Sequence, residues 1–338
     1  MDNSHLPQYI QDLLFPSVFD YQVEKTELIQ THISYVILAG EFVYKFKKPV
    51  DFGFLDFSSL EKRRYFCEQE LLLNRRLCPD LYLEMVSVTK ERDGHRLNGA
   101  GTVIEYGVKM VRMDEKAMMA QVIGRGELTS VHLDRIIDRL VPFYQDAAGG
   151  ETFNDYGTSK VVAVNVLENF DQTETFIGQS GLSNERFEII RDYARSFLAK
   201  EAVFNARIND GKIRDCHGDL YSANICLDDR VHIFDCIEFN ERFRYSDVAA
   251  DVGFLAMDLD YHGLDELSDY FLRQFAEASA DPGLLGVADF YKCYRAYVRG
   301  KIGLFTASDP AVDRDTARNC RKQAERYFDL AERYVRKV

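Results

Sequence analysis

The stretch HGDLYSANICLDDRVHIFD, residues 217–235, carries the most specific pattern in the chain. Within it, two short β-rich runs flank an Asp-rich turn, which predicts a small hairpin. This hairpin would bring Asp219, Asn224 and Asp235 around one point. The two strands are expected at Asn224–Leu227 and Val231–Asp235.

The three polar side chains suit one type of chemistry. Phosphoryl transfer needs a carboxylate that orients the attacking hydroxyl, and two oxygen ligands that hold magnesium on the phosphates. Asp and Asn also favour turns for backbone reasons, so a loop carboxylate by itself indicates little. Here several fixed spacings coincide, which favours the catalytic interpretation.

The motif HGDxxxxN followed by a strand that ends in Asp resembles the catalytic core of aminoglycoside phosphotransferases and choline-kinase-like proteins, within the protein-kinase-like superfamily. The resemblance implies that Asp219 is the catalytic base and that Asn224 and Asp235 bind Mg²⁺. It also implies that His217 supports the loop. Asp247 resembles a structural Asp that holds the catalytic loop through hydrogen bonds.

Two features separate the chain from protein kinases. The segment between Asp235 and Asp247 is too short for an ordinary activation loop, and Ala-Pro-Glu occurs nowhere. Both favour a small-molecule acceptor. Phe234-Asp235-Cys236 also departs from Asp-Phe-Gly, although the resembled family is permissive there.

The rest of the chain predicts an α+β protein with two lobes, and the resemblance implies that these form a bilobal protein-kinase-like fold. A small antiparallel β-sheet lobe with one helix is expected over residues 1–112, and a larger, mainly helical lobe over residues 113–338. Ser58 and Glu61 have capping-box spacing at the start of the first-lobe helix. Strands are expected at 34–38, 42–47, 81–89 and 102–110, and later helices near 129–147, 183–204, 246–259, 264–280, 286–305 and 311–337.

An acidic residue lies on the apolar face of the first-lobe helix. This face is formed by Phe66, Glu70, Leu73 and Leu77. Burying Glu70 without a cation would cost several kcal/mol, on the order of a lost buried ion pair. In the resembled fold this Glu pairs with a strand Lys that contacts the ATP phosphates, and Lys45 matches. Lys47 shares the face of Lys45 because strand side chains alternate, so it remains the alternative.

The remaining nucleotide contacts have weaker signals. Residues 30–34 occupy the place of a phosphate-covering loop, but they contain no glycine. Thr31 and Ser34 are the expected phosphate contacts, and an ordinary hairpin connection is the open alternative. No G-x-x-x-x-G-K-[ST] occurs, which excludes a Walker-type site. Adenine is expected against the backbone of Lys109, Met110 and Val111.

Composition excludes several classes. The net charge of −13 argues against nucleic acid as a partner. No apolar run approaches the ~18 residues that span a bilayer, and the N-terminus has no secretory pattern, so we expect a cytoplasmic protein without a membrane partner. Seven cysteines without Cys-x-x-Cys spacing favour reduced thiols.

Residues 44–55 and 232–240 resemble a bacterial subfamily that is often fused to a C-terminal P-loop ATPase domain. The chain resembles the N-terminal module of that subfamily standing alone, so a separate ATPase is an expected protein partner. Acceptor candidates are Glu238, Glu241, Asp251 and Asp258 for amines, and the stripe Lys292, Arg295 and Arg299 for an anion. For all of them a surface, supporting or internally paired role is favoured.

The leading hypothesis is therefore an ATP- and Mg²⁺-dependent phosphotransferase that acts on a hydroxyl of a small molecule. The alternative is a nucleotide-binding regulatory or pseudokinase module that acts through a protein partner, suggested by the glycine-free loop and the ATPase fusions. A third hypothesis keeps the fold but phosphorylates protein hydroxyls.

Overall fold

The computed structural model describes residues 6–310 and 312–336, which divide into two compact units. Unit 1 comprises the chain up to residue 118 together with residues 226–241, and unit 2 comprises residues 119–225 and 242–338. The boundary lies six residues beyond the predicted residue 112. Residues 226–241 also pack with unit 1, although the predicted division assigned them to the second lobe.

Unit 1 is built on an antiparallel sheet of six strands in the order β1-β2-β3-β6-β4-β5. The alanine–glycine connection at residues 39–41 forms the β2–β3 hairpin, and Gly40 adopts the positive φ of 58° that its turn requires. The predicted strands are present, whereas β1 and β5 were not predicted. The strands are β1 Thr26–Gln30, β2 Ser34–Ala39, β3 Phe42–Lys47, β4 Tyr82–Glu91, β5 Gly94–Leu97 and β6 Thr102–Val111.

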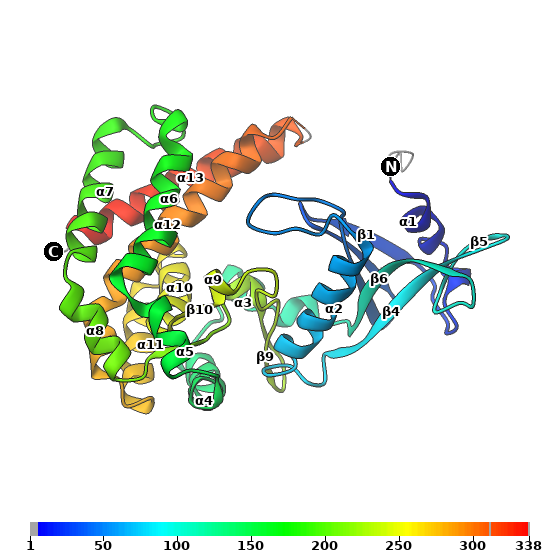
Figure 1. Cartoon of the computed structure of the whole chain (residues 1–338), viewed down its shortest axis with the longest axis horizontal. Helices are drawn as coiled ribbons and strands as arrows, with labels where there is room; N and C mark the ends of the chain where they lie inside the picture. Colours follow the sequence, from blue (N-terminus) through cyan, green and yellow to red (C-terminus); the bar gives the residue numbers. More distant parts are fainter. Residues whose placement is uncertain (1–5, 311, 337–338) are drawn as a thin grey trace. The chain divides into compact units, whose positions relative to one another are not determined.

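Two helices pack against the sheet of unit 1 (Figure 1). Helix α2 (Leu60–Asn74) lies against β4 and β6, and its N-cap is Ser59, whose hydroxyl accepts from the Lys62 N–H. The predicted cap, Ser58, is one residue too early. Helix α1 (Gln8–Leu13), which was not predicted, is followed by the 3₁₀ turn η1 (Pro16–Val18).

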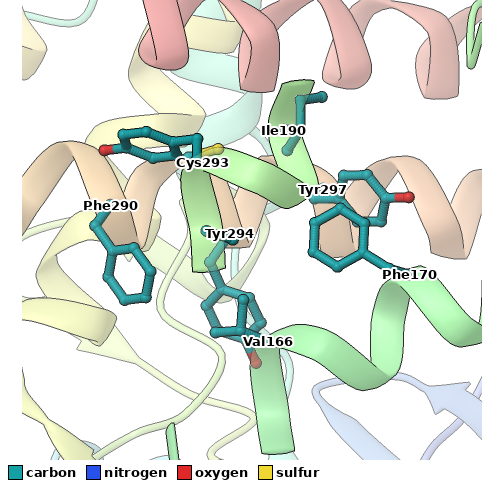
Figure 2. A pocket seen from close by; sticks show the side chains of 9 residues that line it. Val166, Phe170, Ile190, Phe290, Cys293, Tyr294 and Tyr297 are labelled. Carbon is teal, nitrogen blue, oxygen red and sulfur yellow. The ribbon is translucent and has the colours of Figure 1, made fainter. Parts of the chain in front are cut away.

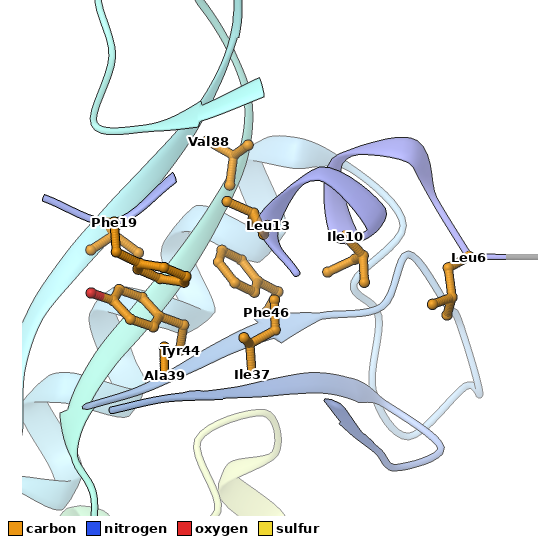
Figure 3. Close-up of a cluster of buried hydrophobic side chains, with 10 residues drawn as sticks. Leu6, Ile10, Leu13, Phe19, Ile37, Ala39, Tyr44, Phe46 and Val88 are labelled. Carbon is orange, nitrogen blue, oxygen red and sulfur yellow. The ribbon is translucent and has the colours of Figure 1, made fainter. Parts of the chain in front are cut away.

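The alternation of β3 gives the two faces of the sheet different chemistry. Tyr44 and Phe46 belong to an apolar cluster with Ile10 and Leu13 of α1 (Figure 3). Lys45 and Lys47 point to the opposite face because successive strand side chains alternate, and there they meet α2. One face therefore forms a core, and the other carries charge.

A second part of the chain completes unit 1. The hairpin of β8 (Ile225–Leu227) and β9 (Val231–Ile233) leads into residues 234–241. Met118, after the 3₁₀ turn η2 (Glu115–Ala117), forms a β-bridge with Cys226. Helix α9 (Glu241–Arg244) begins where this segment ends.

Unit 2 is mainly helical, and α10 (Val248–Tyr261) lies at its centre. Residues 248–260 are all buried, and α10 packs on α11 (Asp265–Ala278) and α12 (Leu285–Ser308). A helix buried on all sides must satisfy its polar side chains within the protein. No helix within residues 6–310 and 312–336 is long and apolar enough to cross a membrane.

The other elements of unit 2 surround this centre. α13 packs along α12, and the strands β7 and β10 pair as a short antiparallel ribbon before α10. The predicted helix at 183–204 is divided into α7 and α8, and α6 was not predicted. The remaining bounds are α3 Met119–Gly124, α4 Ser130–Asp146, α5 Glu151–Asn154, η3 Asp155–Gly157, α6 Ser159–Thr173, η4 Glu174–Phe176, α7 Asn184–Leu198, α8 Glu201–Asn209, β7 Ile213–Asp215, η5 Ser222–Asn224, β10 Tyr245–Asp247, η6 Pro282–Leu284 and α13 Arg314–Arg336.

Candidate active site

Both lysines of β3 contact Glu70 of α2. Lys45 Nζ lies 2.8 Å from Glu70 Oε1, and Lys47 Nζ lies 2.7 Å from Glu70 Oε2. Lys45 also donates a hydrogen bond to Asp235 Oδ1 over 2.5 Å. The sequence left Lys45 and Lys47 as alternatives, whereas the structure uses both and brings Asp235 to Lys45 alone.

Glu238 completes this cluster on the side of Lys47. Its carboxylate accepts a hydrogen bond from Lys47 Nζ, and both side chains are almost entirely buried. The sequence suggested Glu238 as an amine ligand, with a surface or helix-supporting role favoured, whereas the structure buries it in an ion pair with Lys47. The partner lies 191 residues away in the chain, so local sequence gives no sign of it.

The charges in the cluster shift one another's protonation. Burial alone would raise the pKa of Glu70, but Lys45 and Lys47 outweigh it and lower the pKa to about 2. Burial also acts against the charged form of Lys45, yet Asp235 and Glu70 raise its pKa well above the ordinary value. For Glu238 burial prevails, and its pKa is raised. Lys45 and Glu70 therefore stay ionised at neutral pH.

The backbone around Asp235 is fixed by α2 and β4. The Asp235 N–H donates to the Tyr82 hydroxyl over 3.1 Å, and the Cys236 N–H donates to Asn74 Oδ1 over 2.9 Å. Asp235 itself has φ of 62°, in the left-handed region that Asp tolerates better than most residues. Its side chain remains 44% exposed, so one edge of the carboxylate faces outward while the other binds Lys45.

Of the two predicted phosphate contacts in the sheet, the Thr31 hydroxyl already forms hydrogen bonds within the described part of the chain and the Ser34 hydroxyl does not. Thr31 Oγ1 accepts from the backbone N–H groups of Ile33 and Ser34, as in an ordinary hairpin turn. The Ser34 hydroxyl is buried and has no hydrogen-bond partner among the described residues. Ser34 is paired with Lys47 across the β2–β3 ladder, so its side chain belongs to the charged face.

The predicted adenine contacts lie at the end of β6. Lys109 Nζ lies 4.3 Å from the centroid of the Phe42 ring and 3.6 Å from Glu84, and Met110 is buried. The Val111 N–H donates to the Leu81 carbonyl over 2.9 Å. This N–H is therefore already bonded within the sheet.

In unit 2 the loop of residues 217–224 brings Asp219 and Asn224 together. Asn224 Nδ2 donates to Asp219 Oδ2 over 2.9 Å and to the Asp219 carbonyl over 3.0 Å. His217 is fully buried, and its Nδ1 accepts from the Asp219 N–H over 3.2 Å. The intervening Gly218 has φ of 87°, a conformation that favours glycine.

Two carboxylates of α10 hold this loop at both ends. Asp251 accepts from the N–H groups of His217 and Gly218 over 2.6 and 2.9 Å. Asp258, seven residues further along the helix, accepts from the Ser222 N–H over 2.9 Å. Tyr144 of α4 also donates to Asp251. Both aspartates were suggested as amine ligands, with a surface or helix-supporting role favoured, and the structure shows them accepting hydrogen bonds from the loop.

Asp247 has a different task from the one predicted. It is the N-cap of α10, accepting from the Ala249 N–H over 2.9 Å. It also forms a buried bidentate ion pair with Arg207, which bridges to Asp281. The prediction that Asp247 holds the catalytic loop is wrong. Asp251, one helical turn later in α10, holds the loop instead.

The residues expected to bind Mg²⁺ have suitable chemistry. Asp235 offers a partly exposed carboxylate edge, and Asn224 uses its amide nitrogen on Asp219, which leaves the carboxamide oxygen as the donor to a cation. Mg²⁺ prefers such oxygen ligands and usually completes its shell with phosphates and water. Each side chain, considered within its own unit, therefore fits the ion.

A small apolar pocket in unit 2 is not an acceptor site. It lies among α6, α7 and α12 beside Phe170, Cys293 and Tyr297 (Figure 2). Its volume of about 10 Å³ is at the limit for a single water molecule. The pocket is therefore a packing defect of the helical core.

The chain has the same fold as solved choline and ethanolamine kinases. A choline/ethanolamine kinase family protein from Mesorhizobium loti aligns over 97% of this chain and 98% of its own, with 13% identity and a TM-score of 0.51. An ethanolamine kinase from Plasmodium vivax aligns over 94% of this chain and 84% of its own, with 13% identity and a TM-score of 0.50. The predicted fold class is thereby confirmed.

The sequence also has curated relatives in mycobacteria. An uncharacterized protein from Mycobacterium tuberculosis and one from Mycobacterium bovis are each 33% identical over 294 residues, which is 86% of this chain. The alignment covers 57% of each relative, so the chain spans little more than half their length. No model of a known protein family matches the sequence.

Proposed function

We propose that the chain is an ATP- and Mg²⁺-dependent phosphotransferase that phosphorylates a hydroxyl of a small molecule in the cytoplasm. The observation that carries this proposal is the position of Lys45 between Glu70 and Asp235. A lysine held in this way presents a fixed positive charge for nucleotide phosphates, next to a carboxylate suited to the metal. The kinase-like fold supports the same function.

Each residue then has a role in the transfer. Lys45 would bind the α- and β-phosphates, and Asn224 and Asp235 are the residues that would supply oxygen ligands to the metal, whose charge would offset that of the phosphates. Asp219 accepts the proton of the acceptor hydroxyl while the hydroxyl oxygen forms a bond to the γ-phosphorus. The bond from that phosphorus to the β–γ bridging oxygen breaks, and ADP leaves with the electron pair. Asn224 keeps the Asp219 carboxylate oriented.

Transfer of labelled γ-phosphate to a metabolite pool tests the proposal. The wild type should give a labelled product, and Asp219→Asn should reduce its rate by about 100-fold or more, because general base catalysis contributes on that order. Asp228→Asn, in the exposed turn between β8 and β9, is the matched control and should retain the rate. Equal rates for Asp219→Asn and the wild type would remove Asp219 from the proposed role.

A regulatory nucleotide-binding module is the second candidate. It is favoured by the hairpin at Thr31, whose hydroxyl oxygen already accepts two backbone N–H groups and which has no glycine to let phosphates approach. Such a module, paired with a separate ATPase, would gain thermal stability from Mg²⁺–ATP without consuming it. Label on Ser, Thr or Tyr, detected by mass spectrometry, would instead indicate a protein acceptor.

A further inference from the structure

Arg299 of α12 stands out among the cations of unit 2. The predicted basic stripe also contains Lys292, whose Nζ lies 2.6 Å from Asp260, and Arg295, whose guanidinium lies 3.8 Å from Asp251. Arg299 has no carboxylate within 4.0 Å among residues 6–310 and 312–336, and its Nε is buried without a hydrogen-bond partner there. The side chain as a whole is half-buried and hydrogen-bonds Tyr327, but a guanidinium nitrogen taken out of water without an anion is costly, so its retention needs an explanation.

The position of Arg299 links it to the proposed catalytic loop. Its guanidinium lies 4.9 Å from the centroid of the Tyr221 ring and 5.6 Å from that of Tyr327 on α13. Tyr221 is two residues after Asp219 in the loop that α10 anchors. Burial alone would lower the pKa of Arg299, but Tyr327, Tyr221 and the Asp219 carboxylate outweigh it and raise the pKa. The arginine is therefore charged at every ordinary pH and lies within electrostatic reach of Asp219.

The carboxylates close to this region are bonded within the protein. Asp251 and Asp258 accept from backbone N–H groups of the loop, and Asp260 binds Lys292 and Tyr334. A cationic acceptor would have to compete for these carboxylates, at the expense of the loop or of the helix packing. An anionic group would instead supply the partner that Arg299 lacks.

We propose that the acceptor is a hydroxy compound with an anionic group, a carboxylate or a phosphate, which binds Arg299 while its hydroxyl reaches Asp219. The inference rests on the proposed function and specifies its substrate class. The rings of Tyr221 and Tyr327 hold the guanidinium in place by cation–π contact. The transferred phosphoryl group of the nucleotide is the other possible source of an anion. The contact of Arg299 with Tyr221, two residues after the proposed base, favours the acceptor.

Binding of a simple anion tests the inference without turnover. Sulfate is titrated into the full chain while the arginine Nε–H signals are followed by ¹⁵N NMR, and the Arg299 signal is assigned by its loss in Arg299→Gln. Sulfate should shift this signal saturably. Arg326→Gln is the matched control, because Arg326 also stacks on a tyrosine, at 4.2 Å from the Tyr261 ring centroid, but it is exposed. This control should leave the Arg299 response unchanged, and an Arg299 signal that ignores sulfate would overturn the inference.

The two sources of the anion are separated by nucleotide affinity. Arg299→Gln should leave the Kd for Mg²⁺–ADP and for a non-hydrolysable Mg²⁺–ATP analogue within about threefold of the wild type. A loss of about tenfold or more for the ATP analogue would assign Arg299 to the transferred phosphate and overturn the acceptor proposal.

Turnover on a matched set of sugars then tests the substrate class, with glucose as the neutral member, glucosamine as the amine, and gluconate and glucose 6-phosphate as the anions. Transfer to an anionic member, with a KM raised about tenfold or more by Arg299→Gln and partly restored by Arg299→Lys, supports the inference. Transfer to glucosamine that Arg299→Gln does not affect overturns it. If no member is phosphorylated, the sulfate titration alone decides on Arg299. The Asp219→Asn comparison on the metabolite pool decides separately on the phosphotransferase.

Discussion

At the scale of single residues, the charged face of β3 depends on Lys47 as much as on Lys45. Lys47, Glu70 and Glu238 are each at least nine-tenths buried, and Lys47 contacts both carboxylates. Lys45 can compensate Glu70 through its own contact, but within residues 6–310 and 312–336 Glu238 forms an ion pair with Lys47 alone. The two lysines therefore have separable functions, one structural and one proposed for phosphate binding.

Removal of Lys47 should destabilise the protein strongly at neutral pH. Lys47→Met leaves the Glu238 carboxylate buried without its cation, which should lower the free energy of unfolding by about 3 kcal/mol. The loss should shrink as the pH falls, because the pKa of Glu238 is already raised and its neutral form needs no cation. Urea unfolding at several pH values measures both effects.

Lys62→Met provides the matched control for that variant. Lys62 pairs with Asp56 on the surface, where both side chains are more than one-third exposed, so its loss should cost less than about 1 kcal/mol. Similar losses in the two variants would contradict the structural role of Lys47.

Glu70 should also make stability depend on pH, because the two lysines hold it ionised. Its folded pKa of about 2 lies below the ordinary value of 4.5, so its contribution is complete above pH 4.5 and is lost as the pH falls toward 2. The difference in unfolding free energy between the wild type and Glu70→Gln should therefore be largest near neutral pH and vanish at the acidic end. A difference that stays constant over this range would show that Glu70 is not held ionised by the lysines.

At the scale of elements, α10 positions the proposed base without contributing to the chemistry itself. Asp251 and Asp258 lie on a helix that is buried all round and bind three N–H groups of the loop. Because α10 packs against α11 and α12, the loop that it anchors is held as rigidly as the helical core. The positions of the side chains around Asp219 therefore depend on the packing of these helices.

Replacement of Asp251 should loosen the loop. Asparagine supplies one carboxamide oxygen where two carboxylate oxygens accepted, so the N–H of His217 or Gly218 loses its acceptor. We expect a loss of about 1–3 kcal/mol in the opening free energy of the loop. Hydrogen exchange of the amides at 217–219 measures it. Asp265→Asn, at the exposed start of α11, should leave their exchange unchanged.

The elements also show what sequence can predict. Strands β2, β3, β4 and β6 follow from alternation and β-branched residues, and the burial of Glu70 follows from its place on an apolar helical face. α1 has only six residues, too few for a periodic signal.

Residues whose function depends on distant partners were missed. The partner of Asp247 is Arg207, 40 positions away in the sequence, which also binds Asp281. Nothing local therefore separates the N-cap Asp247 from Asp251 as the residue that holds the loop. The contact of Arg299 with Tyr221 arises in the same way, from packing between elements that the sequence does not place. The sequence could predict the other site residues because they lie in recognisable motifs. These residues are Lys45, Glu70, Asp219, Asn224 and Asp235.

At the scale of the whole molecule, residues 226–241 belong to unit 1 although they lie between two parts of unit 2 in the chain. Glu238 and Asp235 bind the lysines of β3, and Asn74 and Tyr82 bind the intervening backbone. The stability of this segment should therefore follow that of unit 1.

Hydrogen exchange of the full chain can test this assignment. Lys47→Met should accelerate exchange in β3 and in residues 231–238, because they share the cluster, and should leave the amides of α10 and α12 protected as in the wild type. Equal acceleration in α10 would show that the two units open together rather than separately.

The assignment of residues 226–241 to unit 1 also has a consequence during synthesis on the ribosome. Unit 1 cannot be completed until residue 241 has emerged, 123 residues after residue 118. At ordinary translation rates this interval is on the order of ten seconds. During that time Lys47 has been made and Glu238 has not, so the nascent N-terminal sheet must wait with one of its charges uncompensated.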